Sequence, residues 1–129
     1  MASELRVNTL KDASGNNSVG MAYVAEGSAK AWVNFDGGAG TLSARDSFNQ
    51  ASLTDNGTGD YSLNFTNSMN NANFNFSVSS GDVGGTNPDR DEGVKELTTA
   101  LGRIFVYHTS TEAARDEGYV GGLTHGDLA

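Results

Sequence analysis

Two short runs in the middle of the chain alternate strictly between apolar and polar side chains, at residues 61–66 and 74–79. Successive side chains of a β-strand point to opposite faces, so each run has one apolar face and one polar face. This pattern is typical of antiparallel strands, and it predicts an all-β fold, either an antiparallel β-sandwich or a jelly-roll-like domain. The apolar members are Tyr61, Leu63, Phe65, Phe74, Phe76 and Val78.

The segment Asp55–Asp60, with the sequence DNGTGD, precedes the first of these runs. Its Asn-Gly pair supplies the positive φ angles that a tight hairpin needs, so the segment is interpreted as a hairpin turn. Two aspartates and an asparagine also leave open a calcium-binding loop. The acidic spacing does not match an EF-hand, and no distal glutamate completes one. The hairpin is therefore preferred, and no metal or other cofactor is predicted.

Three later segments have patterns of differing clarity. Leu97 and Leu101 are four residues apart, so Lys95–Leu101 is interpreted either as about one helical turn or as a loop that enters the next strand. Ile104–Tyr107 is apolar without alternation, which favours a strand buried on both faces. Tyr119–His125 is expected to form the last strand, although its two interior glycines weaken that expectation.

The length of 129 residues suits one domain. Leu, Ile, Val and Phe together make up only about a fifth of the chain, close to the level at which a charged chain becomes disordered. Since the strand patterns argue for order, we expect the chain to share burial with identical copies, as a homotrimer. Residues 1–30 differ in character from the rest, which divides the chain into an N-terminal arm or anchor (1–30) and a β-domain (31–129).

The first residues of the chain carry few large apolar side chains, namely Leu5, Val7 and Leu10, before a polar stretch at residues 12–18. A segment this small cannot bury its own apolar surface. It must therefore lie on the main domain, on another copy of the chain, or on another protein. Leu5, Val7 and Leu10 are accordingly predicted to make subunit or anchor contacts.

The single tryptophan, Trp32, lies in the apolar segment Ala31–Phe35. In a strand, Val33 and Phe35 would face the core, and Trp32 would face outward with Asn34. An outward tryptophan either covers an edge, contacts another subunit or stacks on a sugar. Aromatic residues are enriched at protein interfaces, so a subunit contact is preferred for Trp32.

The composition excludes several classes of function. The formal net charge is −8, and the eight Lys and Arg residues are scattered, which argues against nucleic acid and against insertion in or binding to an anionic membrane. The chain has no cysteine and no signal-peptide pattern, so we expect synthesis in a cytoplasm. Two histidines, His108 and His125, and no catalytic motif lead us to expect no catalytic residues and no enzymatic activity.

Several segments of the chain resemble short tail-fibre-like proteins and other virion surface proteins of marine and environmental bacteriophages. The similar segments cover much of the chain but include no chemical motif. This resemblance implies a trimeric β-sandwich on the particle surface, without catalytic residues. The segments are Leu5–Asn17, Gly27–Gly37, Asp46–Asn49, Leu53–Phe65 and His125–Ala129.

Three functions were compared on this basis. The first is an adhesive tail component at the virion surface, anchored by the arm to other phage structural proteins and contacting a host receptor. The second is a capsid decoration (cement) protein that stabilises the head by binding the major capsid protein, which the lack of a long shaft would suit. The third is a polysaccharide-cleaving tailspike enzyme, against which the absence of a repeat solenoid and of a carboxylate constellation argues.

Overall fold

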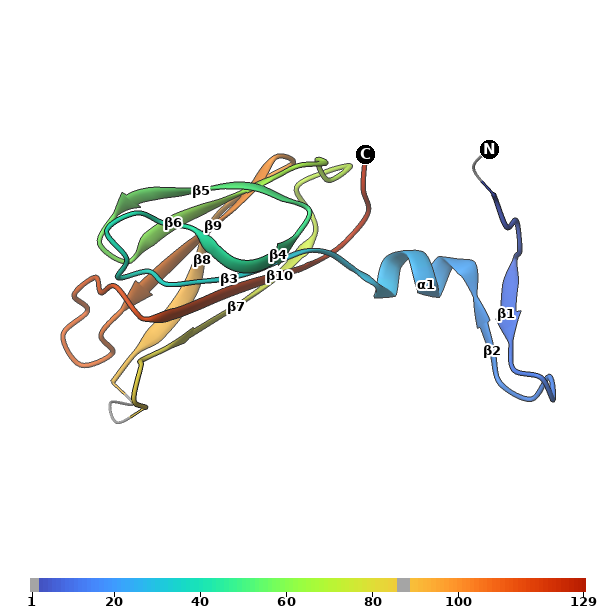
Figure 1. Ribbon diagram of the computed structural model, residues 1–129, viewed down its shortest axis with the longest axis horizontal. Helices are drawn as coiled ribbons and strands as arrows, with labels where there is room; N and C mark the ends of the chain where they lie inside the picture. The colour runs from blue at the N-terminus through green and yellow to red at the C-terminus, as the bar shows by residue number, and fades with distance from the viewer. Residues whose placement is uncertain (1–2, 86–88) are drawn as a thin grey trace.

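A computed structural model describes residues 3–85 and 89–129 of the chain. The described residues form antiparallel β-sheets with one short helix, so the predicted all-β class is confirmed. Figure 1 shows two parts: a body made of two four-stranded sheets, and an N-terminal arm that extends away from it.

The body contains two antiparallel sheets whose strands follow the orders β4–β3–β10–β7 and β5–β6–β9–β8. We call them the first and the second sheet. The first sheet is built from β3 (Ala29–Phe35), β4 (Ala44–Phe48), β7 (Asn75–Gly81) and β10 (Tyr119–His125). The second is built from β5 (Gln50–Gly57), β6 (Asp60–Phe65), β8 (Asp91–Thr98) and β9 (Leu101–Tyr107).

The apolar side chains of the alternating runs form the core between the two sheets. Phe35 from the first sheet and Tyr61 from the second are both fully buried, and their rings meet edge to face with centroids 5.2 Å apart. Leu63 and Phe76 are buried in the same cluster. The alternation in the sequence therefore identified the core face correctly, because period two puts every second side chain on the same side of a strand.

Two expectations for the C-terminal half were wrong. Lys95–Leu101 is neither a helical turn nor a loop: residues 95–98 continue β8, which then turns into β9 at Leu101. Leu97 packs against the core from this strand. Strand β9 is not buried on both faces, because Ile104 and Val106 are buried whereas Phe105 and Tyr107 lie on the outer face, only partly covered. One layer covers each sheet, so only one face of each strand is buried.

The chain crosses from the first sheet to the second at Asn49, which has a φ of 53°. Asparagine tolerates this left-handed conformation better than most residues. Its amide donates to the carbonyls of Lys30, at 2.9 Å, and Asn67, at 3.0 Å, and its side-chain oxygen accepts from the backbone N–H of Asn67 at 2.7 Å. The Asn49 side chain thus holds the corner at which the two sheets join.

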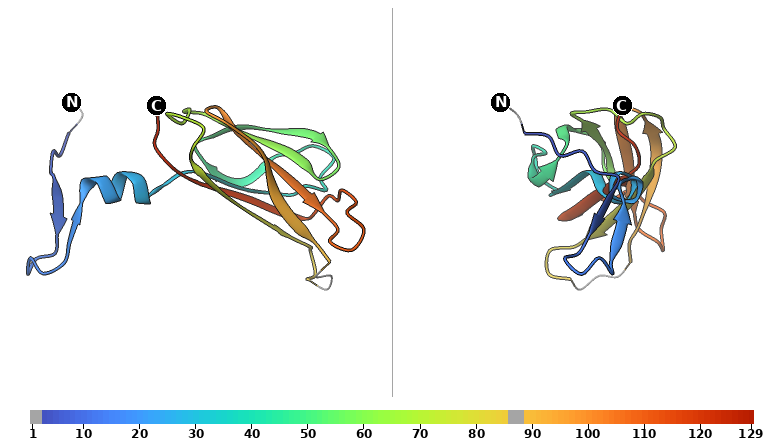
Figure 2. Two further views of the ribbon diagram at one scale, coloured as in Figure 1. Left: turned by 180° about the vertical axis from the view of Figure 1, so that it is seen from behind. Right: turned by 90° about the vertical axis from the view of Figure 1, so that its right-hand side faces the viewer.

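The arm comprises residues 3–28 and contains a small hairpin followed by a helix. Strands β1 (Thr9–Lys11) and β2 (Ser18–Gly20) pair antiparallel, and α1 (Met21–Gly27) follows directly. None of the helix residues is buried. Figure 2 shows from two directions that the hairpin lies beyond the end of the body. All residues of the core cluster lie at position 31 or later, so the core does not depend on the arm.

Candidate assembly surfaces

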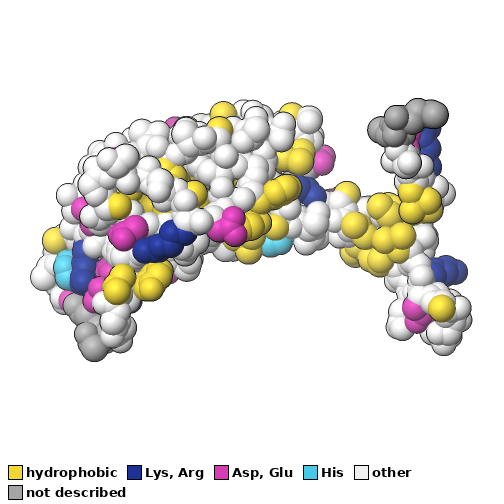
Figure 3. All heavy atoms as spheres, viewed as in Figure 1, with side chains coloured by type: hydrophobic (Ala, Val, Ile, Leu, Met, Phe, Trp, Pro, Cys, Tyr) yellow, Lys and Arg dark blue, Asp and Glu magenta, His cyan; other side chains and the backbone are white. Residues whose placement is uncertain are grey.

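The hairpin of the arm presents an apolar surface that the body does not cover. Leu10 and Val19 lie directly opposite each other on β1 and β2, so their side chains share one face of the hairpin. They are 42% and 37% exposed. Tyr23 on α1 is 78% exposed. Figure 3 shows hydrophobic side chains gathered where the hairpin meets the helix.

The structure places the three predicted contact residues of the arm on this uncovered segment. Leu5 is 80% exposed, Val7 36% and Leu10 42%. The arm therefore does not lie on its own domain, which was one of the three alternatives. Another copy of the chain or another protein remains as its partner.

The hairpin is ordered by polar contacts, although it buries almost nothing. The carboxylate of Asp12 accepts hydrogen bonds from the side chain of Asn17, at 2.6 Å, and from the backbone N–H of Asn16, at 3.0 Å. The bond from Asn17 lowers the pKa of Asp12 below its ordinary value. The backbone N–H of Met21 donates to the carbonyl of Asn8, which ties the helix to the hairpin. A shape fixed in this way lowers the entropy lost when the arm binds a partner.

Contacts at the end of the helix hold the direction of the arm. The ammonium group of Lys30, on β3, donates to the carbonyl of Ala25 and to the hydroxyl of Ser28, the latter at 2.7 Å. A cation next to the last carbonyls of a helix is favourable because those groups carry partial negative charge. Lys30 therefore links the arm to the first strand of the body and keeps it pointing outward.

The outer face of the first sheet carries a row of large apolar side chains. Trp32 on β3 pairs with Phe48 on β4 on one side and with Leu123 on β10 on the other. Phe48 is 52% exposed, Leu123 is 37% exposed, and Trp32 is partly exposed. The prediction that Trp32 faces outward while Val33 and Phe35 face the core is confirmed, since Val33 and Phe35 are 3% and 0% exposed. We call Trp32, Phe48 and Leu123 the apolar ridge.

A shallow groove lies beside the ridge, on the β10–β7 side of the same face. Gly121 pairs with Ser79, and Leu123 with Ser77, so small side chains succeed one another along these two strands. They line a groove of about 350 Å³ together with Asn34 and Leu123. We call Ser77, Ser79 and Gly121 the small-residue groove. The first sheet thus presents a raised half and a hollowed half side by side.

The outer face of the second sheet is charged instead. The carboxylate of Asp60 accepts from Arg103, with Oδ1 at 2.6 Å from Nε and Oδ2 at 2.9 Å from Nη2, and also from Lys95. Arg103 also lies 3.7 Å from Glu96. Hydrogen bonding from Arg103, and then from Lys95, holds the pKa of Asp60 below its ordinary value of 3.8. These charges neutralise one another, and the outward face of this sheet is polar.

We expect Asp60→Asn to lower the free energy of unfolding by about 2 kcal/mol, because Arg103 loses its charged partner at a largely buried site. The folded-state pKa of Asp60 is depressed, so the stabilisation is complete above its ordinary pKa and is lost as the pH falls below it. Urea unfolding between pH 2 and 7 measures both effects. The stability difference from wild type should shrink in acid, whereas the exposed Asp127→Asn control should match wild type at neutral pH; a difference that persists unchanged at pH 2 would contradict this assignment.

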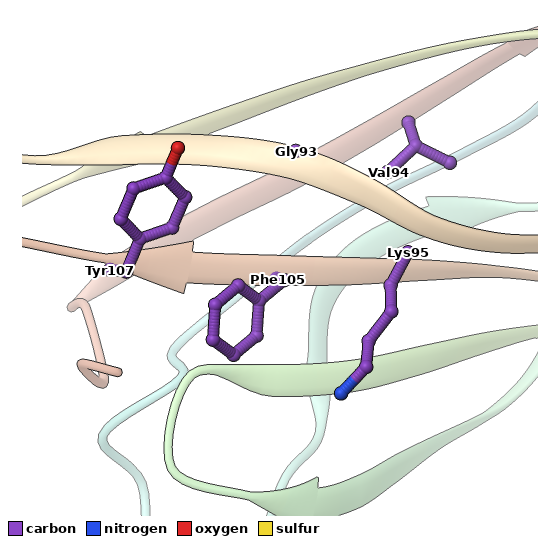
Figure 4. A pocket seen from close by; sticks show the side chains of 5 residues that line it. All are labelled: Gly93, Val94, Lys95, Phe105 and Tyr107. Carbon is purple, nitrogen blue, oxygen red and sulfur yellow. The ribbon is translucent and has the colours of Figure 1, made fainter. Parts of the chain in front are cut away.

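A second open groove lies on the charged face, over Gly93 (Figure 4). The rings of Phe105 and Tyr107 stack beside it with centroids 5.6 Å apart, and the Lys95 ammonium lies 5.1 Å from the Phe105 centroid. Tyr107 donates to Asp91 at 3.0 Å. The two rings cover backbone that the neighbouring glycine leaves open, and the groove brings together no nucleophile and base.

The structure assigns the acidic residues of the β5–β6 turn to separate partners. Asp55 accepts from the backbone N–H of Gly57 at 2.9 Å, within the turn, whereas Asp60 is engaged by Arg103 and Lys95. Cations already occupy the second carboxylate, so the turn does not suit calcium. Among residues 3–85 and 89–129, no group of three His, Asp or Glu side chains is arranged to hold a metal ion. No described helix is long and apolar enough to span a bilayer.

Comparisons with known proteins gave no relative: no protein-family model, no curated protein and no solved structure matches the chain.

Sequence reasoning found part of these surfaces. Leu5, Val7, Leu10 and Trp32 were identified, and the structure places the first three on the arm and Trp32 on the body, so they form two surfaces instead of one. Phe48 and Leu123 were missed. Their signal lies in strand pairing, since both stand opposite Trp32, and pairing between distant segments is not visible in a local pattern.

Proposed function

We propose that this chain is a non-enzymatic structural protein of a bacteriophage particle, a β-sandwich that assembles as a homotrimer at the particle surface and acts as an adhesive, tail-fibre-like component. The observation that carries the proposal is the arm: an ordered segment that extends from the body with Leu10, Val19 and Tyr23 exposed. Exposed apolar surface of this kind marks a site of protein contact. The resemblance to short tail-fibre-like proteins supplies the kind of particle.

The charges of the body support a protein partner over a nucleic acid. Binding to phosphates requires basic side chains that are free to reach them. Most of the Lys and Arg residues of this chain are instead paired with carboxylates, as Arg103 is with Asp60 and Arg115 with Glu117. The arm would bind another structural protein of the particle, either of the tail or the major capsid protein. The body would then face outward, toward a host receptor, after synthesis in the host cytoplasm.

We expect the double variant Leu10→Asp, Val19→Asp to lose attachment to the particle at least tenfold while the body still folds. Two carboxylates on the apolar face of the hairpin would have to be desolvated in the bound state, which is costly. Particles assembled with the variant are purified, and the chain is quantified by mass spectrometry. The control Ser3→Asp, Asn16→Asp adds the same charge to exposed polar positions of the arm.

Circular dichroism of the two variants checks that the body is intact. Loss of particle attachment with an unchanged melting temperature would support the arm as the anchor. Attachment equal to that of wild type in the Leu10→Asp, Val19→Asp variant would overturn the proposal. Gold labelling of the bound protein separates a tail position from a capsid decoration protein on the head.

A further inference from the structure

The two outer faces of the body differ sharply in charge. On the second sheet, Asp60, Arg103 and Glu96 point outward and pair with one another. On the first sheet, the outward positions of β10 and β7 carry only small, polar or apolar side chains and His125. Depletion of charge around exposed aromatic residues is the composition of an interface centre. The first sheet therefore has the character of a contact face.

The charge of the whole chain indicates which partner this face suits. At a net charge of −8, copies of the chain repel one another over most of their surface. Two copies can approach most easily through a face that carries little charge, and the ridge and the groove together form such a face. A partner that was recognised through its basic charges would instead require exposed carboxylates here.

The shape of the face also suits another copy. The ridge lies on the β4–β3 side and the small-residue groove on the β10–β7 side of one sheet. A surface that carries a protrusion beside a matching hollow makes a head-to-tail contact, and such contacts close into rings. Phe48 and Trp32 of one copy would enter the groove formed by Ser77, Ser79 and Gly121 of the next.

We propose that the outer face of the first sheet is the surface through which three copies of this chain form a closed ring, with the apolar ridge of each copy seated in the small-residue groove of its neighbour. The inference rests on the homotrimer of the proposed function and adds the surface and the direction of the contact.

The size of the face indicates that the arm contributes as well. Four strands spaced about 4.8 Å apart and about six residues long cover a flat area of about 400 Å². A stable interface buries about 800 Å² on each partner. The face supplies about half of that area, and we expect the uncovered arm, which begins at the end of β3, to supply further contact with the assembly.

Cross-linking tests the direction of the contact, because the chain has no cysteine of its own. In the double variant Phe48→Cys, Ser79→Cys, each copy carries one thiol in the ridge and one beside the groove. A short bis-maleimide should link the three copies into a covalent trimer on denaturing gels. The matched pair Thr54→Cys, Glu96→Cys places two thiols on the exposed charged face and should remain largely monomeric.

Native mass spectrometry of the unlinked protein separates the two levels of the proposal. A trimer that is linked through Phe48→Cys and Ser79→Cys supports the ring. A trimer that is linked no better than the Thr54→Cys, Glu96→Cys pair would overturn the assignment of the face while leaving the homotrimer standing. A monomer at every concentration would overturn the homotrimer itself.

A second variant tests the ridge without cross-linking. Trp32→Ala should raise the dissociation constant of the trimer roughly 10- to 100-fold, since buried tryptophans dominate the energy of interfaces. The melting temperature of wild type should rise with protein concentration, and that dependence should be weaker in the variant. The control Tyr107→Ala, on the charged face, should retain it; equal concentration dependence in Trp32→Ala and wild type would place the contact elsewhere.

Discussion

Replacing Glu117 with alanine is expected to lower the free energy of unfolding by about 3–5 kcal/mol, the range for breaking a buried ion pair. The Glu117 side chain is only 1% exposed, and its Oε1 lies 2.8 Å from Nε of Arg115 and 3.6 Å from Nε of Arg90. Without the carboxylate, the largely buried guanidinium of Arg115 loses its nearest partner. The next carboxylate, Asp82, is 3.9 Å away.

Urea unfolding followed by tryptophan fluorescence measures this loss. Glu117→Gln should cost less than Glu117→Ala, because the amide keeps the volume and one oxygen acceptor. The control Glu26→Ala, at an exposed position of α1, should change the stability by less than about 0.5 kcal/mol. A Glu117→Ala variant as stable as the Glu26→Ala control would show that the buried charges do not hold the 108–118 loop to the body.

A methyl group at Gly59 is expected to destabilise the body by about 3–4 kcal/mol. Gly59 has a φ of +65°, and a Cβ there would lie 2.2 Å from the carbonyl oxygen of Val106 and 2.8 Å from backbone atoms of Arg115. These are backbone atoms, fixed by the hydrogen bonds from Val106 N to Gly59 O at 2.7 Å and from Arg115 N to Val106 O at 3.0 Å. The clash cannot be relieved by rotating a side chain.

Gly85→Ala is the matched control for this substitution. Gly85 has nearly the same φ, +63°, but a Cβ there meets nothing within 4 Å. It should therefore cost only about 1 kcal/mol, the price of the left-handed conformation. The difference between Gly59→Ala and Gly85→Ala in thermal unfolding isolates the backbone contact, and equal destabilisation would rule that contact out as the cause.

The inward and outward faces of the body could be predicted well from the sequence. Tyr61, Leu63 and Phe76 were placed in the core, and Trp32 on the outside, because strand periodicity is a local property that a single chain displays. The same reasoning explains the correct all-β class.

The features that the sequence did not predict depend on contacts between distant segments. Leu97 and Leu101 stand four apart as in a helix, yet pairing with β9 draws Leu97 into a strand. The charged segment Thr111–Gly118 was expected at the surface, but Glu117 is buried because Arg90 and Arg115 enclose it. Strand propensity is weaker than such tertiary context.

The arm shows a similar limit in its helix. Residues 19–24 were recognised as apolar but not as the end of a strand followed by α1. A helix of seven residues is too short to display a clear periodicity of 3.6. The prediction that the arm needs a partner was still reachable, because it followed from the amount of apolar surface and not from the secondary structure.

The central claim, that this chain is a structural component of a phage particle, is tested most directly on the purified parent particle. Quantitative mass spectrometry with gold labelling gives the copy number and position of the chain. We predict a fixed number of copies, a multiple of three, that withstands washing in high salt and is labelled at the tail. Absence of the chain from washed particles would contradict the claim.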